Sequence, residues 1–252
     1  MSALTTGDAL AALIGALVGI VGGLVGPAVI ARLPEPELAP EPADGEKEPP
    51  SRLRIAPAYT KVLYADLAGR PGLGWRLAAG AAVAGAVLGG ALGWSVDLLV
   101  VLPLVPVGVW LGYVDWRTTF LPTRIIAPSY GVVVAAVAVA ALVQDDRTDA
   151  IRAAEGWAVY GGFFLVMWLI TPGFGYGDVR LAGVLGLALG WLGWPELFLG
   201  IFIGSVLGGV GGALLVLVRI TERGRNPYGP HMLVGAAVAA AYGPWIATQL
   251  GY

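Results

Sequence analysis

Two aspartates, Asp115 and Asp178, are the residues of this chain whose type and position could do chemistry. Asp115 closes an apolar stretch that begins near residue 97, and Asp178 opens another that runs to about residue 194. An ionisable group in such a stretch is a functional candidate, because a charge is expensive in lipid. Two carboxylates at one depth can share a proton, so that one activates water while the other hydrogen-bonds a carbonyl and assists an amine to leave. Peptide hydrolysis by paired acids requires this division of labour.

Each aspartate also has a purely structural explanation. Asp178 could cap the helix that follows it by accepting hydrogen bonds from free backbone amides at the positive end of the helix dipole. Asp115 could pair with Arg117 or stay solvated. The glycines Gly175 and Gly177 in front of Asp178 favour the catalytic explanation, because they leave room for an extended substrate backbone and permit a positive φ.

The strings around the two aspartates resemble the type IV prepilin peptidases, which belong to the GxGD class of membrane aspartic proteases. The residues from Asp115 to Pro122, followed by Thr-Arg, are similar to the first aspartate motif of that family. The residues from Gly175 to Asp178 are similar to the second motif, although Arg180 stands where the family usually has lysine. A third string, Pro227 to Pro230, is similar to the Pro-Phe-Gly-Pro element of the family and predicts a break before the last helix.

The resemblance covers roughly residues 75–250 and implies a role for particular residues. It implies that Asp115 and Asp178 form the catalytic pair and that the site holds no metal. It assigns substrate-binding or supporting roles to Gly175, Gly177, Arg180, Pro122, Pro227 and Gly229. It also implies prepilin or pseudopilin substrates with a short polar leader, cut at the cytoplasmic membrane boundary. The expected location is the plasma membrane of a prokaryote, in a pilus or type II secretion pathway.

The N-terminal part departs from the family. Residues 30–34 resemble the end of the first membrane segment, which in bifunctional members belongs to a domain that methylates the new N-terminus with S-adenosylmethionine. Here Pro27 stands where asparagine is usual, an acidic linker replaces the cytoplasmic domain, and the paired cysteines of some members are absent. We therefore expect neither methyltransferase activity nor a cofactor.

Composition excludes several classes of function. The chain is 57% hydrophobic and 13% charged, with a mean hydropathy of +0.77, so the bilayer is its natural solvent. The net charge is −2 and no basic run is long enough to bind nucleic acid. With no cysteine and only His231, thiol catalysis, cysteine-bound zinc and the paired-histidine zinc helix are excluded.

Apolar stretches of about 20 residues, enough to cross a bilayer, predict an all-α bundle of about eight transmembrane helices. The stretches are 9–31, 75–94, 97–114, 125–143, 157–171, 179–194, 197–218 and 231–249. The expected domains are a first, retained helix in residues 1–32, an acidic proline-rich cytoplasmic linker in residues 33–73, and a seven-helix domain in residues 74–252. The linker is predicted to contain a short interfacial helix over residues 55–67. Glycines at four-residue spacing, such as Gly15 and Gly19, predict close helix packing.

The distribution of lysine and arginine predicts the orientation. Placing both termini outside puts all but Arg147 and Arg152 of the 15 basic residues on the cytoplasmic side, as the positive-inside rule requires. These two lie in a predicted outer loop, residues 144–156. Both aspartates then lie at the cytoplasmic boundary.

Three other functions are weighed against the peptidase. An intramembrane serine protease would need Ser205 and His231 to act together. A small proton- or cation-coupled transporter could use the same two acids, since intramembrane carboxylates also mark ion pathways. The common depth of the acids and the lack of evident broken helices count against transport. An inactive structural membrane protein would need neither aspartate, and the oligomeric state is not predicted.

Overall fold

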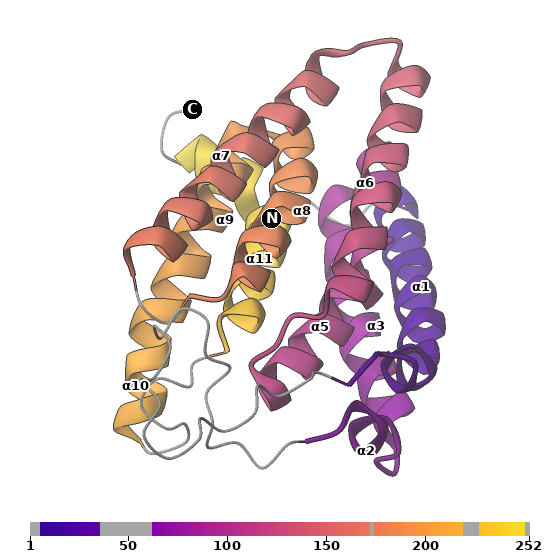
Figure 1. The fold of residues 1–252 in the computed structure, drawn as a ribbon. Helices are drawn as coiled ribbons and strands as arrows, with labels where there is room; N and C mark the ends of the chain where they lie inside the picture. The colour runs from indigo at the N-terminus through magenta and orange to yellow at the C-terminus, as the bar shows by residue number, and fades with distance from the viewer. Residues whose placement is uncertain (1–5, 36–61, 172–173, 219–226, 250–252) are drawn as a thin grey trace, which may run out of the picture.

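The computed structural model describes residues 6–35, 62–171, 174–218 and 227–249, and these parts of the chain contain helices and no strand. Figure 1 shows the helices as one bundle. In chain order they are α1 (Thr6–Ala31), α2 (Tyr64–Ala68), α3 (Leu73–Leu92), α4 (Asp97–Val101), α5 (Leu104–Thr118), α6 (Thr123–Gln144), α7 (Thr148–Ile170), α8 (Tyr176–Leu192), α9 (Trp194–Val206), the π-helix η2 (Leu207–Gly211), α10 (Gly212–Leu217) and α11 (Tyr228–Gln249).

The predicted all-helical, multi-pass fold is confirmed. Six described segments are long and apolar enough to cross a membrane, namely α1, α3, α4 with α5, α6, α7, and α9 with η2. The two remaining predicted stretches correspond to α8, which has 17 residues, and to α11. Much of the predicted linker, residues 36–61, lies outside the described residues, as does most of the predicted interfacial helix. The orientation and the division into domains stay predictions.

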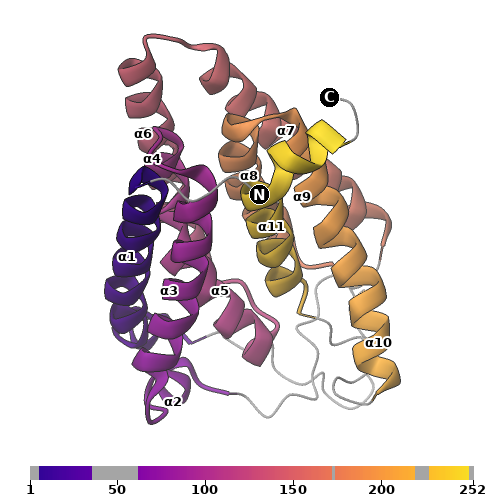
Figure 2. The same cartoon turned by 180° about the vertical axis from the view of Figure 1, so that it is seen from behind.

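The helices form two groups that face each other across the bundle. In one group α1 packs along α3 and contacts α5, and in the other α7 packs along α8 and α9 along α11. Figures 1 and 2 show the first group and α6 on one side and the second group on the other. Contacts of α5 with α11 and of α6 with α8 join the groups.

Small residues allow the helix pairs to approach closely, as the glycine spacing predicts. A Cβ atom added to Gly15 would lie 2.0 Å from the carbonyl oxygen of Gly85, and one added to Gly19 would lie 2.2 Å from that of Ala81. In the second group, a Cβ atom on Gly156 would lie 2.4 Å from the carbonyl oxygen of Gly186. Backbones therefore pack directly against each other, as is typical of helix association in lipid.

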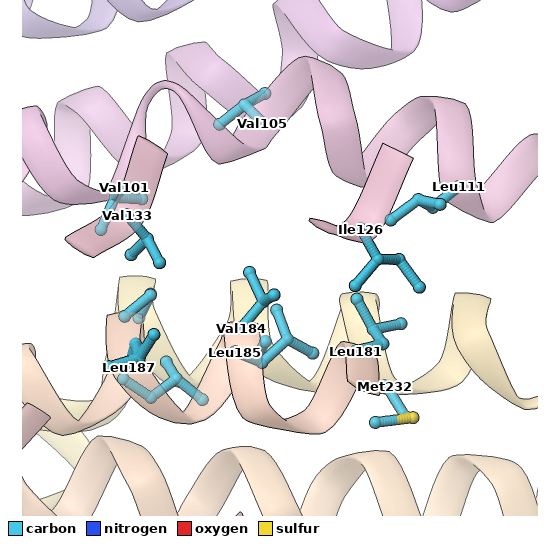
Figure 3. Packing of buried hydrophobic residues seen from close by; sticks show 14 of the residues in the cluster. Val101, Val105, Leu111, Ile126, Val133, Leu181, Val184, Leu185, Leu187 and Met232 are labelled. Atoms are coloured by element: carbon cyan, nitrogen blue, oxygen red, sulfur yellow. The ribbon is translucent and has the colours of Figure 1, made fainter. Parts of the chain in front are cut away.

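Large aliphatic side chains fill the space between the two groups. Figure 3 shows Val105, Leu111 and Ile126 on one side of this interface, opposite Leu181 and Leu185 of α8. Leu111 and Ile126 are each 1% exposed and Leu181 is 2% exposed. Close packing of this kind holds α5 and α8, the helices that carry the two aspartates, in a fixed relation.

The predicted loop over residues 144–156 is too long, because α6 ends at Gln144 and α7 begins at Thr148, not near residue 157. The charged residues of this segment lower its hydropathy, but their side chains form an ion pair and hydrogen bonds within the helical structure. Arg152 forms an ion pair of 2.8 Å with Asp149, three residues earlier on the same helix face. Its guanidinium also donates hydrogen bonds to the carbonyl oxygens of Gly190, at 2.7 Å, and Trp191 at the end of α8.

Other polar groups gather at this end of α8. The indole of Trp191 donates a 2.9 Å hydrogen bond to the carboxylate of Asp97 in α4. Glu196 in the first turn of α9 is 5% exposed, and Gly193 and Gly243 leave the space that its side chain occupies. Sequence analysis missed this network, which joins α4, α7, α8 and α9 at the end of the bundle opposite the two aspartates.

Arg152→Ala is expected to lower the free energy of unfolding by about 1–3 kcal/mol, because two carbonyl oxygens at the end of α8 lose their charged donor. The melting temperature of the purified protein in detergent should fall by about 3–8 °C. Arg147→Ala removes the same charge from the exposed residue just before α7. This control should change the melting temperature by about 1 °C or less. Equal effects of the two substitutions would contradict this role of Arg152.

Candidate active site

Asp115 lies in the last turn of α5 and is 3% exposed. Its Oδ2 atom accepts a 2.9 Å hydrogen bond from the backbone amide of Gly229 in the first turn of α11. A pairing with Arg117 is absent among the described residues, and a solvated side chain is excluded by the burial. The structural explanations considered for Asp115 are therefore wrong, and its carboxylate joins the two helix groups instead.

Asp178 is the third residue of α8 and is 7% exposed. Its Oδ2 atom accepts a 2.9 Å hydrogen bond from the backbone amide of Gly175, the residue before the helix. The predicted capping role of Asp178 is confirmed. A cap of this kind uses one carboxylate oxygen, so it is compatible with a second role for the same group.

The two aspartates come together at one end of the bundle. Leu121, in the connection between α5 and α6, lies between Gly177, which precedes Asp178, and Gly229, which binds Asp115. A Cβ atom on Gly177 would lie 2.8 Å from Leu121 Cβ, and one on Gly229 would lie 3.2 Å from Leu121 Cδ2. The carboxylates are near enough for the charge of Asp178 to act on Asp115. Among the described residues, neither carboxylate forms an ion pair with lysine or arginine.

Gly175 and Gly177 have different local reasons to be glycine. Gly175 has a φ of −84°, and Gly177 is absent from the described glycines with positive φ, so neither glycine adopts the positive φ that this residue type permits. Position 177 requires glycine because its backbone closely approaches Leu121. At position 175, an added Cβ atom would have no neighbouring atom nearer than 3.5 Å. Gly175 is exposed and leaves the approach to Asp178 open.

Arg180 follows Asp178 by two residues in α8, and Pro122 follows Leu121 in the chain. The guanidinium of Arg180 lies over the ring of Tyr176, 4.7 Å from its centroid, and donates a hydrogen bond to the hydroxyl of Thr123. Pro122 is the residue immediately before α6, where its fixed φ ends the connection from α5. Arg180 and Thr123 thus link the start of α8 to the start of α6.

The string from Pro227 to Pro230 lies at the start of α11, and Pro227 itself precedes the helix. Residues 219–226 lie outside the described residues, so the predicted break before the last helix stays a prediction. Helix α11 begins at Tyr228, and the carbonyl oxygen of Pro227 is 2.9 Å from Nδ1 of His231. The first amides of a helix lack partners within it. Gly229 is one of these residues, and its free amide is the group that binds Asp115.

An aromatic cluster next to Asp178 was missed by the sequence analysis. The ring centroids of Phe174 and Tyr228 are 4.7 Å apart, and those of Phe164 and Phe174 are 5.9 Å apart. Tyr228 lies within electrostatic range of the Asp178 carboxylate. These residues come from three separate segments with no common spacing, so no sequence pattern could have predicted the cluster.

A cavity of about 290 Å³ lies between the two helix groups. Every residue that lines it is apolar, and these residues come from α3, α4, α5, α8 and α11. Gly112, one turn before Asp115, and Pro230, next to Gly229, are among the lining residues. The cavity therefore extends from the neighbourhood of Asp115 into the apolar interior.

Other chemistries find little support in the described residues. Ser205 Oγ is buried without a hydrogen-bond partner, and His231 bonds to Pro227, so the two do not form a serine–histidine pair. The described residues contain no group of three or more His, Cys, Asp or Glu side chains that could hold a metal ion. The expected absence of a metal stays a prediction.

Fold and site together define an all-helical, multi-pass membrane protein in which two buried carboxylates, one from each helix group, meet at one end of the bundle. The model of the type IV leader peptidase family matches residues 102–213, a segment that contains both aspartates. Over this segment, the chain is similar to the type IV leader peptidase family.

Several curated relatives named prepilin leader peptidase/N-methyltransferase are similar to the chain. The Pseudomonas putida relative is 33% identical over 168 residues, which are 65% of this chain and 57% of the relative. The Escherichia coli K12 relative is 32% identical over 143 residues, 54% of this chain and 60% of the relative. The Burkholderia pseudomallei 1026b relative is 31% identical over 182 residues, which are 66% of this chain and 53% of the relative. The chain thus spans little more than half the length of these relatives. No solved structure was found to match it.

Gly177→Ala is expected to destabilise the protein, because the new methyl group would lie 2.8 Å from Leu121 Cβ, an atom close to the backbone. Overpacking of this kind costs about 1–3 kcal/mol. Gly175→Ala is the matched control, since its φ of −84° suits alanine, and it should leave stability unchanged or raise it by up to about 1 kcal/mol. Thermal unfolding in detergent measures both. A Gly177→Ala protein as stable as Gly175→Ala would contradict this packing of Leu121.

Proposed function

We propose that this protein is an aspartic endopeptidase that removes the leader peptides of type IV prepilin-like substrates at the cytoplasmic face of the membrane. The observation that carries the proposal is the meeting of Asp115 and Asp178, both buried, at one end of the bundle. The match of residues 102–213 to the type IV leader peptidase family supports the same reaction. The names of the relatives supply the substrate class, prepilins.

In the proposed mechanism the two carboxylates share one proton, because like charges held close resist ionisation of both groups. The ionised carboxylate takes a proton from water, and the water oxygen attacks the scissile carbonyl carbon. The protonated carboxyl donates a hydrogen bond to the carbonyl oxygen. As the carbon–nitrogen bond breaks, a proton passes to the leaving amine, so that one water is consumed and the pair returns to its starting state.

The surroundings of the carboxylates suit this reaction. Each aspartate is fixed by a backbone amide through a single oxygen atom, which orients the carboxylate and leaves its other oxygen for water or substrate. Exposed Gly175 gives an extended chain access to Asp178. A substrate with a polar leader ahead of an apolar helix would place its cleavage site at the boundary where these residues lie.

The alternative, a small proton- or cation-coupled transporter, is less well supported. A pathway for ions needs polar or ionisable groups through the membrane, whereas the cavity between the helix groups is lined only by apolar residues. Both aspartates are at helix ends. The only helix interruptions in the described spans are a proline kink between α4 and α5 and the π-helix η2, neither of which places a charged group in mid-span.

The proposed location is the plasma membrane of a prokaryote, where pilus assembly or type II secretion supplies prepilin or pseudopilin substrates. We propose that the chain acts without a cofactor. Pro27 lies within α1 where the related methyltransferase domain usually has asparagine, and the linker that replaces that domain carries no cysteine. Methylation of the product by S-adenosylmethionine is therefore not part of the proposed activity.

Asp115→Asn and Asp178→Asn are each expected to abolish cleavage of a co-expressed type IV prepilin, by about 10³-fold or more. Asparagine keeps an oxygen that can accept the observed amide hydrogen bonds, so the fold should persist. Asp66→Asn, at an exposed position of α2, is the matched control and should cleave like the wild type. Mobility shift and N-terminal sequencing at equal membrane levels give the result. Cleavage that survives in either variant would overturn the proposal. A wild type that does not cleave the prepilin would overturn it as well.

The mature pilin released by this protein is expected to carry an unmodified N-terminus. The measurement is intact-mass spectrometry of pilin from cells that contain no other prepilin peptidase. A bifunctional relative, such as that of Pseudomonas putida, is the control and should add the mass of one methyl group. A methylated product from this chain would contradict the expected loss of methyltransferase activity.

A further inference from the structure

We propose that the aromatic contact between Phe174 and Tyr228 sets the spacing of Asp115 and Asp178, so that the two rings are positioning residues for the carboxylate pair. This inference rests on the proposed function of the two aspartates. Among the described residues, no hydrogen bond joins either aromatic side chain to an aspartate. The rings would therefore act through the backbone that they hold in place.

Each aspartate is bound by a peptide group that an aromatic residue shares with a glycine. The amide that binds Asp178, at 2.9 Å, belongs to the peptide group between Phe174 and Gly175. The amide that binds the other aspartate, also at 2.9 Å, belongs to the peptide group between Tyr228 and Gly229. A peptide group is planar and rigid. The place of each donor amide therefore depends on the aromatic residue directly before it.

The rings of Phe174 and Tyr228 are in direct contact. Their centroids are 4.7 Å apart and their planes are inclined by 53°, a separation at which aromatic pairs attract each other. Phe174 lies just before α8, and Tyr228 is the first residue of α11. The contact therefore holds the starts of these two helices, and the two donor amides, at a fixed spacing.

Phe164 of α7 supports both rings from the interior. Its centroid lies 5.9 Å from that of Phe174 and 5.7 Å from that of Tyr228, and both contacts are edge to face. Tyr160, one turn earlier on α7, packs against Phe164 at 5.4 Å. Phe164 and Tyr160 are both fully buried. A closely packed interior of this kind leaves the upper pair of rings little freedom to move.

The π-helix η2 fixes the ring of Tyr228 from another side. The Tyr228 hydroxyl donates a 3.3 Å hydrogen bond to the carbonyl oxygen of Ser205, two residues before η2. A Cβ atom added to Gly208 would lie only 2.2 Å from Cε2 of Tyr228. The ring thus occupies the space that a side chain at position 208 would take. A substitution at Gly208 would displace the ring without touching either aspartate.

The spacing of the carboxylates matters because the proposed mechanism needs both of them at one water and one carbonyl group. Two acids share a proton only while they are held close. A displacement of about 1 Å in a catalytic group can lower the rate by about 100-fold. Loss of the ring contact should therefore lower kcat. If the rings instead bound the substrate, their loss would raise KM.

The first test compares Phe174→Leu, which keeps an apolar side chain but removes the ring, with Phe198→Leu. Phe198 is 56% exposed and stacks on Trp194 at 5.7 Å, at the end of the bundle opposite the aspartates. The purified proteins cleave a type IV prepilin in detergent over a range of substrate concentrations. Phe174→Leu should lower kcat by about 10- to 100-fold and change KM by less than about twofold. Phe198→Leu should behave as the wild type.

Tyr228 provides the second arm of the test. Tyr228→Leu should lower kcat as much as Phe174→Leu does, whereas Tyr228→Phe keeps the ring and should retain most of kcat. Phe174→Leu combined with Tyr228→Leu should be no worse than the more impaired single variant, because both remove the same contact. Additive losses, or a loss for Tyr228→Phe as large as for Tyr228→Leu, would overturn the inference.

Two neighbouring glycines of η2 provide a third arm that leaves both rings in place. Gly208→Ala should lower kcat by about tenfold or more, because its methyl group displaces the Tyr228 ring. Gly209→Ala is the matched control, since a Cβ atom there would have no neighbour within 4 Å, and it should cleave like the wild type. Equal rates for the two variants would contradict the role of the ring position.

Wild type and Asp115→Asn, run in parallel, separate the two proposals. Cleavage by the wild type, none by Asp115→Asn and unchanged kcat for Phe174→Leu would retain the peptidase and overturn the role of the rings. No cleavage by the wild type with several prepilins would overturn both. A raised KM with unchanged kcat would assign the rings to substrate binding and reject positioning. A loss of kcat fully accounted for by a smaller folded fraction would reject it as well.

Discussion

The hydrogen bond from the Gly229 amide to the Asp115 carboxylate is the contact on which the site depends. It joins residues 114 positions apart in the chain and connects α5 in one helix group to α11 in the other. In a low-dielectric interior an unpaired helix-start amide and an unpaired carboxylate are both costly, so each satisfies the other. A side chain at Gly229 would lie 2.8 Å from Asp115 Oδ2, which explains the glycine.

The same chemistry recurs at Asp178, whose carboxylate binds the amide of Gly175. Structural and catalytic explanations of the two aspartates are therefore not alternatives. In both cases a helix terminus fixes the carboxylate from one side, and the other oxygen is left for a different partner. Leu121, packed between Gly177 and Gly229, keeps the two helix starts side by side.

The sequence predicted much of this arrangement, because the signals it contains are strong ones. Hydropathy located the helices, and an acid in a very apolar chain drew attention to Asp115 and Asp178. The start of α7 was missed because the charges of Asp149 and Arg152 lower the hydropathy, although they pair with each other and Arg152 caps α8. Contacts such as that between Trp191 and Asp97 join segments far apart in the chain, and no periodicity marks them.

The rigidity of the two carboxylates bears on the kind of reaction they can support. A group that carries ions has to exchange ligands as each ion passes, which requires mobile or hydrated surroundings. Here each carboxylate is buried and held by a backbone amide, and the adjoining cavity is apolar. Preorganised groups of this kind stabilise charge that develops at one fixed point. The arrangement therefore favours bond cleavage over transport for the pair formed by Asp115 and Asp178.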